Sequence, residues 1–305
     1  MAPPEETPPE SQKIDWNIRP ITPVLGVEIE GVDLKIVSEL QAATIEDLFN
    51  QHSALLFRGQ HLEAQDLVRF SRYFGELDEA PVNETGKTAV EGYPEIYVIS
   101  NITGKDGKAV GSLGAGEASW HTDMSYLENP PRASLLYSVE IPPEGGNTWL
   151  AGMFGALETL PASLRRDIEG RRIKHDGTYN SAGFVRQGLE ASDDPLTCPG
   201  TFHPAICRHP ETGREVLFLG RRRNACVEGV SLAQSERLLD DLWQHATEAE
   251  LTYSHQWQVG DVLMWDNRTT LHRRDPFDRN ARRYMLRTQI RGRKCPAEST
   301  PSPSV

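Results

Sequence analysis

The sequence predicts a mainly β protein with helical decorations, built on a jelly-roll or sandwich core. Short apolar segments bounded by turn residues dominate both flanks of the chain, whereas helical periodicity falls near the start and in the insertions. The chain does not alternate regularly between strand and helix around a glycine-rich phosphate loop, which argues against a doubly wound α/β fold.

The elements of the first third follow from the spacing of apolar residues. Residues 24–34 alternate apolar and polar side chains and predict a strand that leads into a turn. Helical spacing is present over 38–52 and again over 64–76, where the pattern stops at Gly75. The apolar runs 53–59 and 95–101 predict strands, the first of them buried.

The remaining elements begin after a segment, residues 102–119, whose five glycines predict a mobile loop. Residues 133–153 read as a strand, a Pro-Gly turn and a second strand, and 153–172 as a helix around a proline. Residues 231–250 form an amphipathic pattern behind a serine cap. Three further strands are expected, at 251–259, 261–267 and 282–292.

Composition limits the class of protein. A chain of 305 residues is long enough for one large core, and we expect a single domain over residues 14–294 between disordered tails at 1–13 and 295–305. The net charge of −12 argues against non-specific binding to nucleic acid or to an anionic membrane. No apolar run is long enough to span a bilayer, and the start lacks a secretory signal. Four cysteines without a CxxC pair predict reduced thiols and a cytoplasmic location.

The segment WHTDMSY (120–126) contains a candidate metal site. Residues two apart on a strand point to the same face, so His121 and Asp123 would present an imidazole and a carboxylate together. Two histidines and one carboxylate commonly hold iron(II) in oxygenases. A lone His-x-Asp is weak evidence, because the same pattern arises by chance on a half-buried strand.

A third ligand is available in GDVLMWDNRTTLHRRDPF, where His272 follows an apolar strand. Closure of a barrel would bring this strand next to His121 and Asp123. Two alternatives remain: His272 lies on the surface between charged loops, or the same three donors hold zinc.

Arginines downstream of His272 favour iron over zinc. Positions 283, 285 and 287 share one face of the strand RRYMLRTQ, so Arg283 and Arg287 would point together. A guanidinium beside an open iron position would grip the far carboxylate of a 2-oxo diacid. The alternative is that these arginines, like Arg282 on the opposite face, are solvated strand charges.

At this point the motifs resemble a known family. HTD (121–123), GGNT (145–148), WDNRTTLH (265–272) and RRYMLR (282–287) are similar, in this order, to the Fe(II)/2-oxoglutarate dioxygenases of the taurine and 2,4-dichlorophenoxyacetate dioxygenase group. The segments FRG (57–59) and FGEL (74–77) also resemble that group, and the likeness spans about residues 20–292.

The resemblance implies a double-stranded β-helix core, cupin-like in architecture, and an enzyme that uses Fe(II), 2-oxoglutarate and O2. It implies that His121, Asp123 and His272 bind iron, and that Thr148 and Arg283 hold the far carboxylate of 2-oxoglutarate. It implies hydroxylation of a small molecule, with release of succinate and CO2. Arg287 matches an arginine that faces the substrate's acid group. Ala80 stands where the taurine enzymes carry a substrate-binding histidine, so taurine is not the expected substrate.

The substrate is expected to be small and anionic, because Arg287 would face it. Tyr126 and Asn83 are candidates for contact with it, since both are close to substrate loops of the family. The segment GRRRNACVEG (220–229) offers three arginines, of which we name Arg222 as the candidate; the alternative is a solvated basic loop. A homo-oligomer, either a dimer or a tetramer, is the expected assembly.

Two other functions use the same residues. One is a zinc- or iron-dependent hydrolase or isomerase on a cupin-like barrel, which would use His121, Asp123 and His272 without 2-oxoglutarate. The other is a non-catalytic binding protein that has kept the fold.

Overall fold

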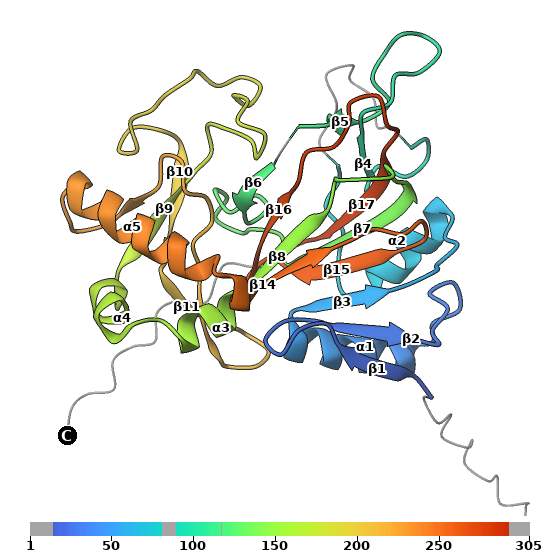
Figure 1. Cartoon of the computed structure of the whole chain (residues 1–305), viewed down its shortest axis with the longest axis horizontal. Coiled ribbons are helices and arrows are strands. Elements are labelled where there is room, and N and C mark those ends of the chain that lie inside the picture. Colours follow the sequence, from blue (N-terminus) through green and yellow to red (C-terminus); the bar gives the residue numbers. More distant parts are fainter. Residues whose placement is uncertain (1–14, 81–89, 117, 293–305) are drawn as a thin grey trace, which may run out of the picture.

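Two β-sheets face each other in the computed structural model, which describes residues 15–80, 90–116 and 118–292 (Figure 1). The larger sheet has the strand order β1-β2-β3-β15-β7-β17-β4-β5, and the smaller has the order β14-β8-β16-β6. Apolar side chains meet between the sheets, among them Leu136 and Met285 from the larger and Leu150 from the smaller. This arrangement confirms the predicted jelly-roll core of the double-stranded β-helix type.

The bounds of the elements are as follows. The larger sheet contains β1 (Asn17–Pro20), β2 (Val27–Glu30), β3 (Ala54–Phe57), β4 (Tyr97–Ser100), β5 (Ser112–Leu113), β7 (Ala133–Glu140), β15 (Val262–Asp266) and β17 (Tyr284–Ile290). The smaller sheet contains β6 (Ala118–His121), β8 (Thr148–Gly152), β14 (Thr252–His255) and β16 (Thr270–Arg274). Two minor sheets contain β9 (Arg172–Asp176), β10 (Gly200–Pro204), β11 (Ile206–Arg208), β12 (Glu215–Leu217) and β13 (Cys226–Val227). The helices are α1 (Glu39–His52), α2 (Ala64–Arg72), α3 (Met153–Glu158), α4 (Ala162–Ile168), α5 (Leu232–Ala246) and the 3-10 turn η1 (Ala249–Leu251).

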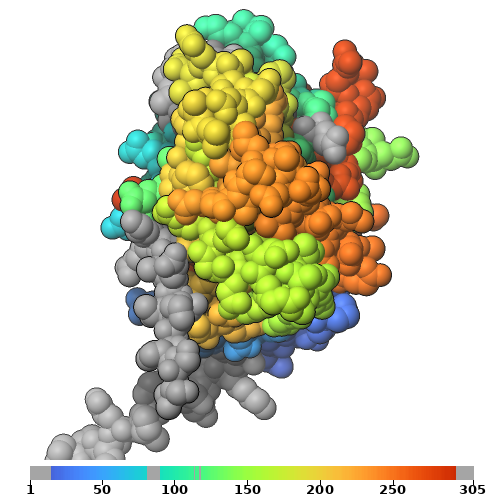
Figure 2. Space-filling model, turned by 90° about the vertical axis from the view of Figure 1, so that its left-hand side faces the viewer, coloured from blue at the N-terminus to red at the C-terminus, as the bar shows by residue number. Residues whose placement is uncertain are grey.

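Helices cover the outer faces of both sheets. Helix α1 begins at Ser38, whose hydroxyl accepts from the Gln41 N–H in a capping box, and it buries Ile45 and Phe49 against the larger sheet. Helices α3 and α5 cover the smaller sheet, where Leu271 of β16 belongs to the same buried cluster as their side chains. Figure 2 shows α5 (orange) beside the segment near residue 190 (yellow) on this face.

The predicted elements are present, although most are shorter than expected. The helical pattern over 153–172 forms two helices, because Pro161 stands at the N-cap of α4 and cannot continue α3. The prediction of a mobile loop over 102–119 is wrong in part. Residues 112 and 113 form edge strand β5, parallel to β4. Gly111 permits this approach, since a Cβ there would lie 2.7 Å from the Val98 carbonyl oxygen.

The structure contains strands that the sequence did not predict, and two predicted segments lie outside the described residues. Strands β1, β9–β13 and β16 are additions, because their segments mix charged or polar and apolar residues without a clear period of two. The predicted tails at 1–13 and 295–305 lie outside the described residues. None of the described helices is long and apolar enough to cross a membrane.

Candidate metal centre

His121 and His272 come together because their strands pair directly. In the smaller sheet, β16 runs antiparallel to β6 with His272 opposite His121, so both side chains leave on the same face. Their ring centroids are 4.0 Å apart, and the His272 ring also lies 4.9 Å from that of Trp265. His272 is therefore within a strand of its own, rather than at the edge of the preceding strand as the sequence suggested.

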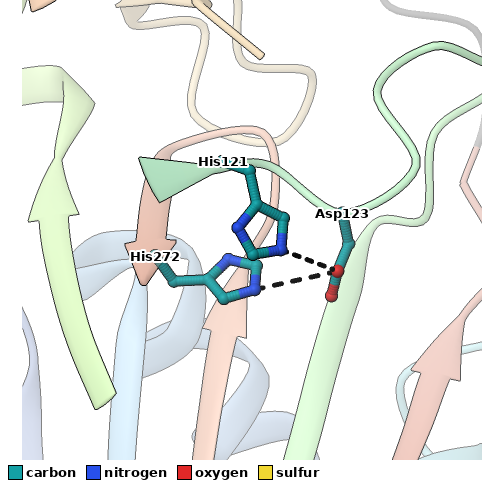
Figure 3. A group of neighbouring side chains, drawn as sticks. All are labelled: His121, Asp123 and His272. Atoms are coloured by element: carbon teal, nitrogen blue, oxygen red, sulfur yellow. Dashed lines mark ion pairs between the residues drawn. The ribbon is translucent and has the colours of Figure 1, made fainter. Parts of the chain in front are cut away.

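Asp123 reaches the two imidazoles from a turn. Strand β6 ends at His121, and Met124 has a left-handed φ of +46°, so the expected extended His-x-Asp strand is not what aligns these ligands. The Asp123 Oδ1 atom lies 3.6 Å from His121 Nε2 and 3.7 Å from His272 Nε2. One donor atom from each residue lies within 4.8 Å of the others, and all three residues are buried (Figure 3).

Neighbouring groups orient these donor atoms. His121 Nδ1 donates to the Ser119 carbonyl oxygen at 2.7 Å, which leaves the lone pair on Nε2 directed toward Asp123 and His272. The outer carboxylate oxygen of Asp123 accepts from three side chains, at 2.9 Å, 3.2 Å and 3.3 Å respectively: Ser134, Gln289 and Arg287. The inner oxygen, Oδ1, therefore remains the one that faces the histidines.

The electrostatics favour the protonation states that a metal ion requires. Burial lowers the pKa of His121 and holds that of His272 well below its ordinary value, so both rings are neutral. Burial alone would raise the pKa of Asp123, but the charge of Arg287 holds it well below its ordinary value. Two neutral imidazoles and one carboxylate on one face match the donor set of mononuclear iron(II) oxygenases, which leaves other positions open.

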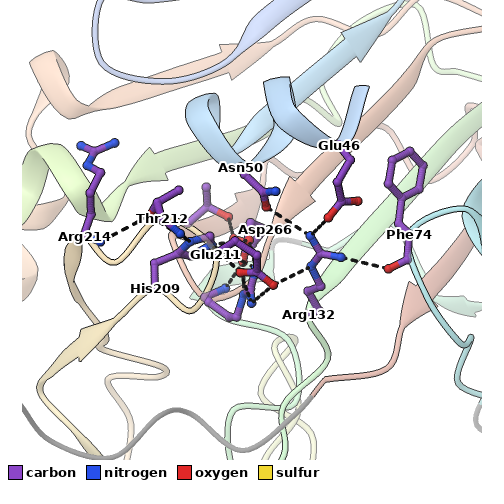
Figure 4. A network of polar contacts seen from close by, with 11 residues as sticks. Glu46, Asn50, Phe74, Arg132, His209, Glu211, Thr212, Arg214 and Asp266 are labelled. Atoms are coloured by element: carbon purple, nitrogen blue, oxygen red, sulfur yellow. Dashed lines mark hydrogen bonds and ion pairs between the residues drawn. The ribbon is translucent and has the colours of Figure 1, made fainter. Parts of the chain in front are cut away.

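The hairpin that carries His272 is anchored by a buried ionic network (Figure 4). Asp266, at the end of β15, accepts from Arg268 Nε at 2.9 Å and from Nη2 at 2.6 Å, and His209 Nε2 lies 3.2 Å away. Arg268 also pairs with Glu211 at 2.9 Å. This network ties the β15–β16 turn to the loop after β11, so the approach of His272 to β6 depends on it.

Asp266→Ala is expected to lower the free energy of unfolding by about 3–5 kcal/mol, because it removes the buried carboxylate that pairs with the half-buried Arg268 at 2.6 Å. Burial alone would raise the pKa of Asp266, but Arg268 holds it below its ordinary value. The stabilisation that the Asp266–Arg268 pair contributes is therefore complete above about pH 4 and is lost as the pH falls further. Denaturant unfolding at pH 7 and at lower pH measures both the loss in the variant and this pH dependence. Glu228→Gln, in the exposed pair with Arg172, is the control and should cost less than about 1 kcal/mol. Equal losses in the two variants would contradict the role of the network.

A buried cation, Arg283, lies beside Arg274, which follows His272 by two residues on β16. Its side chain is 1% exposed, its Nε has no hydrogen-bond partner, and it forms no ion pair with a carboxylate among the described residues. Burial, and then the nearby charge of Arg274, lower its pKa to about 9. Thr148 is opposite Arg274 in the pairing of β16 with β8. The guanidinium groups of Arg274 and Arg283 lie 5.7 Å and 5.9 Å, respectively, from the centre of the Phe277 ring. Such a cluster is suited to an anionic ligand.

The residues predicted to contact the substrate lie in different places. Arg287 is engaged with Asp123 and lies 5.0 Å from the Tyr97 ring, so it orients a member of the triad. Tyr126 is half-buried, with the Arg186 guanidinium 4.3 Å from its ring. The structure places Arg222 against α5, where it pairs at 2.7 Å with both Glu236 and Asp240. Asn83 lies outside the described residues.

Arg221 is the basic residue of segment 220–229 that approaches the triad. Its backbone pairs with that of His121, and the Thr122 N–H donates to the Gly220 carbonyl at 2.9 Å. The sequence could not single it out among three consecutive arginines. The one available signal was Gly220, which precedes them. Its φ is +71°, and a Cβ there would lie 2.1 Å from Nδ1 of the buried His175.

Gly220→Ala is expected to destabilise the protein by about 3 kcal/mol, from the left-handed backbone and the overlap with His175 together. Thermal and denaturant unfolding measure the loss. Gly213→Ala is a matched control: its φ is +70°, but nothing lies within 4 Å of the added carbon. It should cost only about 1 kcal/mol. Similar costs at the two positions would show that His175 readily moves aside.

A double-stranded β-helix with a buried His-Asp-His group, and a buried arginine that has no carboxylate partner among the described residues, defines a class of mononuclear metal-dependent oxygenases. The chain belongs to the taurine catabolism dioxygenase TauD, TfdA family, whose model matches residues 17–289. The enzyme is an α-ketoglutarate-dependent dioxygenase that uses Fe(II), 2-oxoglutarate and O2. The family assignment thus decides against the alternative hydrolase, isomerase and non-catalytic binding functions.

Relatives cover most of the chain. It is 34% identical to an α-ketoglutarate-dependent 2,4-dichlorophenoxyacetate dioxygenase of Cupriavidus pinatubonensis, over 88% of this chain and 95% of that one. It is 32% identical to an α-ketoglutarate-dependent sulfate ester dioxygenase of Pseudomonas putida, over 85% of this chain and 84% of the relative. The crystal structure of a taurine dioxygenase from Burkholderia xenovorans matches with a TM-score of 0.73 at 33% identity, over 91% of each chain.

Proposed function

We propose that the enzyme hydroxylates a small anionic organic molecule while it converts 2-oxoglutarate and O2 to succinate and CO2. One oxygen atom enters the substrate as a hydroxyl group, and the other enters succinate. When the hydroxylated carbon carries an oxygen or sulfur atom, the product collapses with cleavage of that C–O or C–S bond. The relatives named for 2,4-dichlorophenoxyacetate and for sulfate esters support a substrate with an acid group and such a bond.

The observation that carries the proposal is the direct pairing of His272 with His121 beside Asp123. In this assignment the three residues hold the iron, which supplies the site for O2 activation when it is bound. Ser119 and Arg287 support them: Ser119 fixes the tautomer of His121, and Arg287 holds Asp123 ionised and oriented.

Thr148 and Arg283 are proposed to hold the far carboxylate of 2-oxoglutarate. The buried Arg283 lacks a carboxylate partner among the described residues, and a charge-assisted pair with the cosubstrate would supply one. The Thr148 hydroxyl accepts from Trp257 Nε1 at 3.1 Å, which leaves its own proton available for donation. The triad and Arg283 are buried, which shields the proposed site from bulk solvent.

Substrate contact remains a prediction for Tyr126 and Asn83. We propose that Arg287 orients Asp123, which it contacts at 3.3 Å. We do not propose Arg222 for substrate contact, because it pairs with Glu236 of α5. Ala80, where the taurine enzymes carry a histidine, is half-buried, and we do not propose taurine as the substrate.

We further propose one catalytic domain over residues 14–294 in a cytoplasmic protein that forms a dimer or a tetramer. Buried thiols at Cys198 and Cys226, neither of them in a disulfide, support a reducing compartment.

The test is a pair of measurements on the purified enzyme. Anaerobic addition of Fe(II) and 2-oxoglutarate should produce a weak visible charge-transfer absorption band. In air, acids from a panel of carboxylates, sulfonates, sulfate esters and aryloxyalkanoates should stimulate the release of succinate. Absence of both the band and succinate would contradict the proposal.

A further inference from the structure

The Ser134 hydroxyl lies at the centre of a buried hydrogen-bond network behind Asp123. Ser134 belongs to β7 and is fully buried, and its hydroxyl donates to Asp123 Oδ2 at 2.9 Å. Two side-chain amides donate to the same hydroxyl, from Asn267 at 3.2 Å and from Gln289 at 3.3 Å. A serine hydroxyl has one proton and two lone pairs. Because each lone pair has an amide donor, the proton is what remains for Asp123.

Side chains that can only donate fix the orientation of both amides. The Trp265 indole N–H donates to Asn267 Oδ1 at 2.9 Å, so the NH2 group of Asn267 is directed to Ser134. In the same way, Arg287 Nη2 donates to Gln289 Oε1 at 3.2 Å, and the NH2 group of Gln289 also faces Ser134. The direction of every hydrogen bond in the network therefore follows from the chemistry of its two ends.

This network saturates one of the two carboxylate oxygens. Asp123 Oδ2 accepts from Ser134, from Gln289 at 3.2 Å and from Arg287 at 3.3 Å. Oδ1 shares the Arg287 donor at 3.4 Å and faces the two histidines. An oxygen with three donors has no lone pair left for a metal ion, so Asp123 offers iron Oδ1 alone. Binding through both oxygens would occupy a position that the cosubstrates need.

The network also contacts a second member of the triad. Trp265 is opposite Ser134 in the antiparallel pairing of β15 with β7, so their side chains share a face, and the Trp265 ring lies 4.9 Å from that of His272. The Asn267 N–H donates to the Arg132 carbonyl oxygen at 2.9 Å, which ties the turn after β15 to the start of β7. The network therefore links the strand that carries Ser134 to the hairpin that carries His272.

We propose that Ser134 and Asn267 are positioning residues of the metal centre. Asn267, oriented by Trp265, fills a lone pair of Ser134 and commits the Ser134 proton to the outer oxygen of Asp123. The inference rests on the proposed function, because it takes the His-Asp-His triad as the iron ligands. It adds two residues that are not ligands themselves but set the affinity of the site for iron through the orientation of a ligand.

The principal test is the Fe(II) dissociation constant of Ser134→Ala, measured by anaerobic equilibrium dialysis in the absence of 2-oxoglutarate. We expect it to rise by roughly 10- to 100-fold, the usual effect of removing a group that orients a metal ligand. Ser134→Thr keeps the hydroxyl and should restore part of the affinity. Circular dichroism of the metal-free variants establishes that each is folded in the dialysis buffer.

Ser138→Ala is the matched control. Ser138 is another buried serine of β7, and its hydroxyl donates to the Gln258 carbonyl oxygen at 2.6 Å, away from the triad. Its loss removes a buried hydrogen bond from the same strand but leaves the donors of Asp123 in place. The Fe(II) dissociation constant of Ser138→Ala should therefore remain within about twofold of the wild-type value.

A second test determines whether Asn267 acts through Ser134. Asn267→Leu removes the amide donor with little change in volume and should raise the Fe(II) dissociation constant by roughly 3- to 10-fold. In the Ser134→Ala background, the same substitution should change it by less than about twofold, because the hydroxyl through which Asn267 acts is absent. Such non-additivity distinguishes a directed network from two independent contributions to packing.

Three results would overturn the proposal. The first is an Fe(II) dissociation constant in Ser134→Ala within about twofold of the wild-type value; if that variant does not fold, the same limit applies to Asn267→Leu. The second is an equally large rise in Ser138→Ala, and the third is an additive loss in the double variant. Absence of Fe(II) binding by the wild-type enzyme would instead contradict the proposed metal centre itself.

Discussion

Replacement of His272 with alanine is expected to abolish stable iron binding and to lower the rate of succinate formation by at least about 1,000-fold, equivalent to about 4 kcal/mol. Its imidazole is opposite that of His121 across two paired strands, and no other described histidine, cysteine or carboxylate joins this group to replace it. Metal analysis after dialysis, together with the anaerobic band, measures the loss.

His61→Ala is the matched control for this variant, since His61 is exposed and remote from the triad in the sequence. It should retain both iron and activity. Retention of the band in His272→Ala would mean that His121 and Asp123 suffice to hold the metal, and the third ligand would have to be sought elsewhere.

Replacement of Arg283 with methionine is expected to raise the 2-oxoglutarate concentration needed for half-maximal activity by roughly 100-fold. Loss of one member of a buried charge pair commonly costs 2–5 kcal/mol, or more than about 30-fold. Iron should still bind, because Arg283 makes no contact with the triad. A titration with 2-oxoglutarate at saturating Fe(II) measures the change.

The adjacent Arg282 provides the control for Arg283. It points away from the barrel and pairs with Glu140 at 2.7 Å, and its side chain is 62% exposed. Arg282→Met should leave the 2-oxoglutarate requirement within about twofold of the wild-type value. An unchanged requirement in Arg283→Met would remove that residue from the cosubstrate site.

The contrast between Arg282 and Arg283 shows what periodicity can predict. The period of two placed Arg283, Met285 and Arg287 on one face, and the structure buries Met285 in the cluster between the sheets. Alternation thus predicts the side of a strand to which a residue points. It does not predict the contacts made there, such as that of Arg287 with Asp123 at 3.3 Å.

The triad shows the same division. The sequence indicated that His121, Asp123 and His272 could form one metal site. The geometry expected for Asp123 was wrong, because this residue lies in a turn after β6 and not on the strand. A left-handed Met124 and three hydrogen-bond donors from other strands orient the carboxylate. Such donors belong to β7 and β17, and their approach is a property of the closed barrel.

The sequence by itself determined the type of core and the main helices and strands, and it predicted the residues that we propose for iron and 2-oxoglutarate. These features depend on local periodicity and on the donor atoms of individual side chains. Only the tertiary structure decided which cation forms an ion pair and which forms none with the residues that the structure describes. Arg221, Arg222 and Arg223 are indistinguishable in composition, and they differ because Gly220 turns the backbone against β6 while α5 presents Glu236 and Asp240 to the next arginine. Pairing depends on distances between segments far apart in the chain, and no local pattern contains those distances.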